Sequence, residues 1–210
     1  MIQSFDVFVM LIRIIICFAF GSIPFAVIAM AGSGIDIRKV GSGNPGFNNV
    51  LRVSKPRAMI ALLGDMGKGI VVLLLVRHGV HAVWELWAFG FAAILGHCYS
   101  PFLKFKGGKG IATSAGVMLV LYWLFAVISL VFFVLMRLAC GKKLKLKEAG
   151  AIASLSSWVL FVLMMLIFRT PVDALCAAVV AAFLFWRHKK NLIHLLAKRG
   201  PVPAQRSEPA

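Results

Sequence analysis

Two short glycine-rich segments carry the residues best suited to chemistry in this chain. Residues 41–49 read GSGNPGFNN and residues 105–110 read FKGGKG, and strongly apolar runs lie on either side of them. Glycine lets a backbone turn tightly and bring its N–H groups close to an anion, and Ser, Asn and Lys add further donors. Irregular backbone is not tolerated in lipid, so such loops lie at a membrane interface or line a polar cavity. These segments therefore predict a phosphate site.

The lysine of the second segment has the better surroundings for an anion. Lys109 is followed by residues 111–116, IATSAG, which read as the start of a helix rich in small residues. Backbone N–H groups and the positive end of that helix would then meet beside the ammonium group. The spacing is not that of a Walker A loop. The alternative is that the glycines only permit turns and the lysines only set topology, and we prefer that alternative for the lysine run at 142–147.

Further polar residues lie inside or at the ends of the apolar runs. Asp65 and Lys68 share one helical face, which fits either a structural ion pair or a lysine that contacts a substrate phosphate. His97 ends an apolar run and is either a hydrogen-bonded cap or a catalytic group. Ser157 either packs between helices or binds substrate. Asn191 stands out among the basic residues that follow the last run.

Metal and cofactor chemistry finds no support in the sequence. It contains no HExxH or GxSxG motif, and its acids and histidines are not spaced as metal ligands. The four cysteines are scattered without CxxC spacing and read as small buried hydrophobes. We therefore expect no metal and no cofactor.

The composition is that of an integral membrane protein. The 210 residues are 61% hydrophobic and 14% charged, with a mean hydropathy of +0.93, whereas soluble domains are about 45–50% apolar and about 25% charged. The net charge of +16 fits cytoplasmic loops under the positive-inside rule, so anionic lipid head groups rather than nucleic acid are the expected counter-charge. We predict an all-α polytopic transmembrane bundle.

The number and direction of the spans follow from the basic residues. Apolar runs occupy about 5–31, 57–76, 82–98, 111–139, 150–168 and 172–186. All basic residues except Arg13, Lys68, Arg77 and Arg169 lie in residues 32–57, 99–109, 137–147 and the segment after 186. These four connections lie on the same side of the membrane only if the run at 111–139 forms two short helices with a turn near 121–125. The positive-inside rule then predicts about seven spans, at least one short or partial, with the N-terminus out and the C-terminus in.

The domain organisation is expected to be simple. Residues 1–199 read as a single transmembrane domain, and residues 200–210 read as a disordered cytoplasmic tail.

Taken in order, the polar segments resemble the blocks of the PlsY family, bacterial membrane acyl-phosphate:glycerol-3-phosphate acyltransferases. Residues 36–49 (DIRKVGSGNPGFNN) resemble D-[IL]-R-x-x-G-S-G-N-x-G-A-T-N. Residues 96–113 (GHCYSPFLKFKGGKGIAT) resemble G-H-x-x-P-x-F-x-x-F-x-G-G-K-G-[VI]-A-T. The shorter segments 154–157 (SLSS) and 187–191 (RHKKN) resemble S-L-x-S and R-H-x-x-N-I. The likeness is clear over about 21–113, and the order of the blocks extends it to about 196.

The resemblance implies an enzyme that moves a fatty acyl group from acyl phosphate to the 1-hydroxyl of glycerol 3-phosphate, giving lysophosphatidic acid and phosphate. It implies a multi-pass protein of the bacterial inner membrane whose site faces the cytoplasm, among membrane lipids. The acyl donor has a good leaving group, so catalysis can rest on positioning and charge stabilisation. Proton removal by a substrate phosphate oxygen is preferred to a serine nucleophile. The oligomeric state stays open, a monomer included.

The resemblance also implies residue roles. One group holds the acyl phosphate and polarises its carbonyl: Ser42, Gly43, Asn44 and Lys109. A second group binds or orients glycerol 3-phosphate: Arg52, Ser157, His188 and Asn191. His97 is a candidate for proton transfer or phosphate contact. The catalytic set is thus Ser42, His97, Lys109 and Asn191, and the substrate-binding set is Gly41, Gly43, Asn44, Gly46, Asn49, Arg52, Lys68, Gly107, Gly108, Ser157 and His188.

Three departures from the family pattern affect these roles. Phe47 and Asn48 replace Ala-Thr in the first block. Ser100 stands where the family has proline, with Pro101 one place later. A glutamate usual after the last block is missing. The first and third departures leave the core donors intact but put the roles of Asn48 and of the tail in doubt.

Two other classes of protein share some of these features. A phosphate or organophosphate transporter would share the glycine-rich anion loops, but it should have polar residues on both sides of the membrane, and the outer connections here are short and nearly featureless. An acyltransferase that uses acyl-CoA or acyl carrier protein would usually carry an H-x(4)-D motif, which this sequence lacks.

Overall fold

A computed structural model describes residues 4–144, 146 and 148–197, so the tail expected at 200–210 and the last residues of the expected domain lie outside it. Every regular element in the described residues is a helix. The longer helices are α1 (Ser4–Gly21), α4 (Lys55–Val76), α5 (Val83–Cys98), α6 (Ile111–Leu121), α7 (Trp123–Leu138), α8 (Ala149–Phe168) and α9 (Pro171–Arg187). The short ones are α2 (Phe25–Met30), α3 (Phe47–Val53), α10 (Lys189–Leu196), the 3-10 turn η1 (Pro101–Leu103) and the π-helical turn η2 (Ala139–Lys143).

Five helical segments are long and apolar enough to cross a membrane: Asp6–Met30, α4, Val83–Leu103, Trp123–Gly141 and α8. The pair α9 and α10, bent by 64°, makes a sixth if it is counted as one span. Helix α6 has 11 residues, about 16 Å at about 1.5 Å per residue, which is short of a hydrocarbon core about 30 Å thick. The all-helical membrane bundle is therefore confirmed, and its short element lies where the sequence predicts one.

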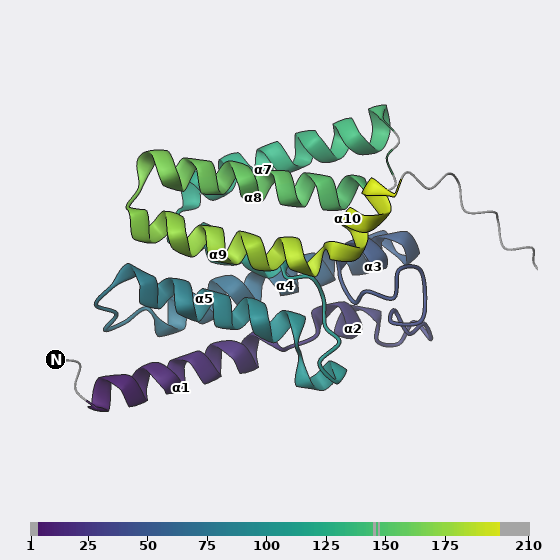
Figure 1. Cartoon of the computed structure of the whole chain (residues 1–210). Helices are drawn as coiled ribbons and strands as arrows, with labels where there is room; N and C mark the ends of the chain where they lie inside the picture. The colour runs from purple at the N-terminus through teal and green to yellow at the C-terminus, as the bar shows by residue number, and fades with distance from the viewer. Residues whose placement is uncertain (1–3, 145, 147, 198–210) are drawn as a thin grey trace, which may run out of the picture.

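The apolar run at 111–139 breaks at Tyr122, within the predicted turn region. The hydroxyl of Tyr122 donates to the carboxylate of Asp173 in the first turn of α9. Trp87, in the first turns of α5, donates its Nε1 proton to the same carboxylate at 3.1 Å. The break, the start of α5 and the start of α9 therefore share one end of the bundle. The described parts of the four basic connections gather at the other end, as the charge pattern predicts (Figure 1).

Figure 1 shows the resulting arrangement. Helices α1, α5, α9, α8 and α7 lie lengthwise beside one another, with α4 behind them; α6 packs against α4. The short helices α2, α3 and α10 gather at the end away from the N-terminus. The bundle thus provides the frame, and the irregular segments that carry the predicted site lie together at one end of it.

Aromatic side chains fill the middle of the bundle. Trp87, Phe89, Trp158 and Phe161 are all at most 2% exposed. Trp158 of α8 donates its Nε1 proton to the Ser114 hydroxyl of α6 at 3.1 Å, so its polar group is satisfied inside the core. The outward faces instead expose large apolar side chains, such as Leu75, Ile167 and Leu175. Such faces suit lipid rather than water.

The carboxylate of Asp173 joins three elements, which makes it a test of the fold. In Asp173→Ala, the donors on Trp87, Tyr122 and Thr170 lose their acceptor. We expect the free energy of unfolding in detergent to fall by about 1–3 kcal/mol, since buried donors without partners are costly. Denaturation by sodium dodecyl sulfate, followed by circular dichroism, measures it. Val172→Ala, at a neighbouring exposed position, is the control, and equal stability of the two variants would contradict the expectation.

Candidate active site

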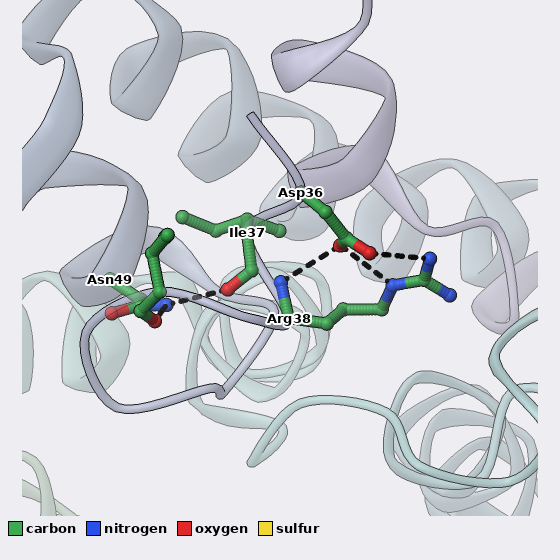
Figure 2. Close-up of polar contacts among 5 residues, drawn as sticks. Asp36, Ile37, Arg38 and Asn49 are labelled. Carbon is green, nitrogen blue, oxygen red and sulfur yellow. Dashed lines mark hydrogen bonds and ion pairs between the residues drawn. The ribbon is translucent and has the colours of Figure 1, made fainter. Parts of the chain in front are cut away.

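Asn49 of α3 shapes the first glycine loop, defined as residues 40–46. Its side chain is buried, and its Oδ1 accepts the backbone N–H of Ser42 at 3.0 Å. Its Nδ2 donates to the carbonyl oxygens of Ile37 at 2.9 Å and Val40 at 3.0 Å; Figure 2 shows the bond to Ile37. The amide of Asn49 therefore supports the loop from inside, and its predicted contact with substrate stays a prediction.

An ion pair holds the turn that leads into this loop. Arg38 donates its Nε and Nη2 protons to the two carboxylate oxygens of Asp36, both at 2.9 Å (Figure 2). These bonds lower the pKa of Asp36 to about 2, so the carboxylate stays charged over the physiological range. Because both side chains are exposed, the pair contributes shape more than stability.

The remaining candidates of the first glycine loop lie on its open side. Gly41 and Gly43 have φ of +57° and +66°, a conformation that favours glycine. Ser42 between them is exposed, and its Oγ accepts the N–H of Asn44 at 3.4 Å. Arg52 of α3 is also exposed, and its Nη1 lies 3.5 Å from the position that a Cβ on Gly41 would take. A hydroxyl and a guanidinium thus face outward around this loop. Gly46 is buried and immediately precedes α3.

The second glycine loop, defined as residues 104–110, is tied to the end of α5. The N–H groups of Gly107 and Gly108 donate to the carbonyl oxygens of Cys98 and His97, both at 3.1 Å. Nη2 of Arg187, the last residue of α9, donates to the Gly108 carbonyl oxygen at 2.7 Å. Those two amide protons are therefore used inside the protein. The donors that remain closest to the bundle are the side chain of Lys109 and the first-turn N–H groups of α6, which have no partner within the helix, whereas Lys104 and Lys106 are exposed.

His97, Asp65 and Lys68 form a buried cluster beneath this loop. Asp65 Oδ1 lies 3.0 Å from Lys68 Nζ and 3.3 Å from His97 Nδ1. Lys68 also donates to the Ile23 carbonyl oxygen at 2.9 Å and is 2% exposed. The geometry favours the ion-pair interpretation of Asp65 and Lys68, and it gives no support to a substrate contact by Lys68. A Cβ on Gly108 would sit 2.1 Å from His97 Nε2, so only glycine lets the loop lie directly on the imidazole.

Residues of this buried cluster and of both loops line one small cavity. Its volume is about 10 Å³, enough for about one water molecule. Pro45 of the first glycine loop and Gly108 of the second both line it, together with Asp65, Lys68 and His97. The two loops that the sequence singled out therefore meet over one polar cluster.

A chain of three polar side chains crosses the open side of the second glycine loop. Lys109 Nζ donates to Asn191 Oδ1, and Asn191 Nδ2 donates to the carboxylate of Glu148. Partial burial lowers the pKa of Lys109 below its usual value, the charge of Glu148 raises it, and the charges of Arg187 and Arg52 lower it further. Lys109 is thus a cation with incomplete solvation, and an anionic ligand would stabilise its charged form.

The predicted residues Ser157, within α8, and His188, directly after α9, differ in how their polar groups are used. His188 is 4% exposed, and its Nδ1 lies 2.8 Å from the Leu184 carbonyl oxygen. A carbonyl only accepts, so Nδ1 carries the proton and Nε2 is the free nitrogen of the neutral ring. The Ser157 hydroxyl donates to the Ser154 carbonyl oxygen at 2.9 Å inside its own helix. His188 can thus face a ligand with Nε2, whereas the Ser157 hydroxyl is already used.

The structure brings some of the candidates together and separates others. Lys109 and Asn191 are in contact. Besides partial burial, the charges of Arg187, the residue before His188, and of Arg52 lower the pKa of Lys109, so both lie close to it. His97 and Lys68 lie in the buried cluster on the inner side of the loop. The sequence analysis missed Glu148 and the brace formed by Arg187. Glu148 carried one signal, since it is an acid at the end of a run of lysines, whereas Arg187 looked like any basic residue after a span.

The structure gives contacts for two of the three departures from the family pattern. Ser100, in place of proline, donates its hydroxyl to the Ser22 carbonyl oxygen at 2.6 Å and so ties η1 to the end of α1. Phe47 begins α3, and Asn48 places its Nδ2 3.2 Å from the position of a Cβ on Gly150 at the start of α8. Of the segment where a glutamate is usual, residues 195–201, the structure describes residues 195–197. Within those residues, the carboxylate bonded to Asn191 is that of Glu148.

The described part of the chain contains no group of three or more His, Cys, Asp or Glu residues that could hold a metal ion. The groups that the structure brings together at the site are amides, hydroxyls, imidazoles and cations, with the carboxylates of Asp65 and Glu148. Such donors suit an oxyanion, and phosphate in particular.

Comparison with known proteins agrees with this chemistry. A family model described as glycerol-3-phosphate acyltransferase matches residues 11–198. Glycerol-3-phosphate acyltransferase 1 of Deinococcus radiodurans is 38% identical over 189 residues, covering 89% of this chain and 92% of the relative. Glycerol-3-phosphate acyltransferase of Caulobacter vibrioides strain NA1000 is 39% identical over 201 residues, covering 90% of this chain and 88% of the relative.

Solved structures give the same result. The crystal structure of PlsY, an integral membrane glycerol 3-phosphate acyltransferase, in its glycerol 3-phosphate form is similar to this chain with a TM-score of 0.79 and 31% identity, over 91% of this chain and 94% of that one. The lysophosphatidic acid form of PlsY matches with a TM-score of 0.79 and 30% identity over the same shares of the two chains.

The brace formed by Asn49 can be tested directly. Asn49→Ala removes the acceptor for Ser42 N–H and both donors to Ile37 and Val40. We expect the free energy of unfolding in detergent to fall by about 1–3 kcal/mol. Asn48→Ala, at the adjacent exposed residue, is the matched control and should change it by less than about 0.5 kcal/mol. Equal thermal midpoints for the two variants would show that Asn49 does not support the loop.

Proposed function

This chain belongs to the glycerol-3-phosphate acyltransferase family, and we propose that it moves a fatty acyl group from acyl phosphate to the 1-hydroxyl of glycerol 3-phosphate within the membrane. The products are lysophosphatidic acid and phosphate, as in the first acylation of phospholipid synthesis. The observation that carries the proposal at this site is the contact of Lys109 with Asn191. It sets a partly desolvated cation beside an amide and an imidazole, at the end where the two glycine loops meet.

Each substrate has a matching part of the site. The first glycine loop offers the exposed Ser42 hydroxyl and the side-chain amide of Asn44, which suit the phosphate of the acyl donor. The backbone N–H groups of Gly43 and Asn44 already donate within the loop, to the Val40 carbonyl oxygen and to Ser42 Oγ. Arg52 and Lys109 supply charge between the two loops. His188 and Asn191 stand on the glycerol 3-phosphate side, His188 through its free Nε2. The apolar outer faces of the helices leave the acyl chain in contact with lipid.

The reaction requires little from the protein except placement and charge. The 1-hydroxyl oxygen of glycerol 3-phosphate attacks the acyl carbonyl carbon, the bond from that carbon to the phosphate oxygen breaks, and phosphate leaves with the electron pair. The proton of the hydroxyl passes to a phosphate oxygen of a substrate. Lys109 and the donors of the first glycine loop stabilise the charge that develops on the carbonyl and phosphate oxygens. His97, packed beneath the loop with Asp65, acts in this scheme through the loop that it supports.

The orientation in the membrane follows from charge. We infer that the end with the four basic connections faces the cytoplasm of a bacterial inner membrane, with the N-terminus outside and the C-terminus inside. Both water-soluble groups of the reaction, glycerol 3-phosphate and phosphate, then enter and leave from the cytoplasmic side.

The acyl donor decides between this proposal and its rival. Purified protein in detergent is mixed with glycerol 3-phosphate and either palmitoyl phosphate or palmitoyl-CoA. We expect lysophosphatidic acid and phosphate with palmitoyl phosphate and no product with palmitoyl-CoA. Turnover with palmitoyl-CoA alone would reject the proposed donor. Transport of phosphate by reconstituted vesicles without acyl transfer would favour a transporter instead.

Lys109 is the residue on which the proposal depends most. Lys109→Ala should reduce phosphate release by at least about 10²-fold, since it removes a charge that stabilises the transition state. Lys106→Ala, an exposed lysine of the same loop, should retain activity and serves as the control. Circular dichroism checks that both variants are folded. Activity near wild type in folded Lys109→Ala would overturn the role assigned to Lys109.

The route of the proton and the acyl group gives a separate test. If the acyl group moves directly between the substrates, quenching the enzyme after mixing with palmitoyl phosphate alone leaves Ser42 unmodified. Intact-protein mass spectrometry measures this. A mass increase that maps to an acyl ester on Ser42, and that glycerol 3-phosphate removes, would replace direct transfer with a serine nucleophile.

A further inference from the structure

Glu148 is an acidic residue close to Lys109 and Asn191, two groups that the proposed function assigns to the phosphate-bearing substrates. It immediately precedes α8, and one of its carboxylate oxygens accepts from Asn191 Nδ2. The other oxygen lies 3.9 Å from Nδ1 of His194 in α10, and the side chain is 22% exposed. A carboxylate repels the phosphate of an incoming substrate. Its presence beside Lys109 and Asn191 therefore calls for a role that outweighs this repulsion.

The hydrogen-bonding chemistry of Asn191 supplies that role. The two ends of its amide have nearly the same shape, but one end only accepts and the other only donates. The Lys109 ammonium can only donate and the Glu148 carboxylate can only accept, so the two together allow a single orientation of the amide. That orientation is the one observed, with Oδ1 toward Lys109 and Nδ2 toward Glu148.

We propose that Glu148 is a positioning residue that fixes the amide of Asn191, so that Asn191 Oδ1 receives the Lys109 ammonium and holds it in place for substrate phosphate. The expected effect on kcat/KM rests on the proposed function, whereas the hydrogen bonds that join Glu148, Asn191 and Lys109 do not. These bonds also join elements that are far apart in the chain, because Glu148 stands at the start of α8, Asn191 in α10 and Lys109 in the loop before α6.

The role predicts a specific pattern among variants. Glu148→Ala removes the acceptor, so the Asn191 amide is free to rotate and Lys109 loses its fixed partner. Glu148→Gln keeps a side-chain carbonyl oxygen that can accept from Asn191 Nδ2, so it should restore most of the lost activity. We expect kcat/KM for glycerol 3-phosphate to fall about 10–100-fold in Glu148→Ala, the effect of losing a hydrogen bond to a charged group. Most of that loss should be in KM.

A double-mutant cycle separates positioning from general stability. If Glu148 acts through Asn191, the variant carrying both Glu148→Ala and Asn191→Ala should be no worse than Asn191→Ala alone. An exchanged pair tests the same contact from the other side. The variant Asn191→Asp sets two carboxylates together, so its activity should fall. In the double variant with Glu148→Gln, activity should recover, because the amide introduced at position 148 can donate to the carboxylate introduced at position 191 while that carboxylate still accepts from Lys109 Nζ. Leu146→Ala, at an exposed neighbouring residue, is the control.

The experiment measures phosphate release from palmitoyl phosphate at varied glycerol 3-phosphate, and unfolding in detergent for the same variants. Non-additive losses and recovery in the exchanged pair support the inference. Wild-type activity in Glu148→Ala, additive losses, or a Glu148→Gln variant as impaired as Glu148→Ala would each overturn it. An inactive wild-type protein would instead reject the proposed function. In that case coupling between Glu148 and Asn191 in the unfolding free energy still decides the inference, and its absence overturns it.

Discussion

The structure of the site depends on keeping one lysine charged where water only partly reaches it. Lys109 lies at the end of a bundle of apolar helices, and its partial burial disfavours the ammonium form. A cation in such a place needs fixed partners, or it turns toward solvent or loses its proton. Asn191 supplies a neutral acceptor and Glu148 a counter-charge. What the lysine still lacks is a full anionic partner, and a substrate phosphate can provide one.

The supports of the two glycine loops explain why so few of the site's polar groups are free. Asn49 uses its whole amide to hold the first glycine loop. The second glycine loop is held from beneath by His97 and from the side by Arg187. Buried polar groups are stable only when they are paired, so the inner side of each loop is occupied by the protein itself. The outer side, with Ser42, Arg52 and Lys109, is left for ligands.

Much of the arrangement of the helices could be predicted from the sequence, because it follows from hydropathy and charge. The break at Tyr122 was predicted from the distribution of lysines, and the structure has it within the expected turn. Residue roles were harder to predict. Asn49 reads as a ligand-binding group, yet it bonds to Ile37 and Val40, which no spacing rule reveals. The ion pair of Lys68 with Asp65 is one of the two alternatives that their i, i+3 spacing left open, whereas the bond of Lys68 to Ile23 follows from no spacing. Glu148 and Arg187 were missed since their partners lie 43 and 79 residues away in the chain.

A structure of this protein with a stable analogue of acyl phosphate bound, one that keeps the phosphate group, tests the central claim most directly. A phosphate oxygen should lie about 2.7–2.9 Å from Lys109 Nζ, as in other charge-assisted hydrogen bonds, with Asn191 still bonded to Glu148. A phosphate bound away from Lys109, for example on the exposed Lys143 near the end of α7, would contradict the account. In that case the two glycine loops would be elements of the fold rather than the walls of an active site.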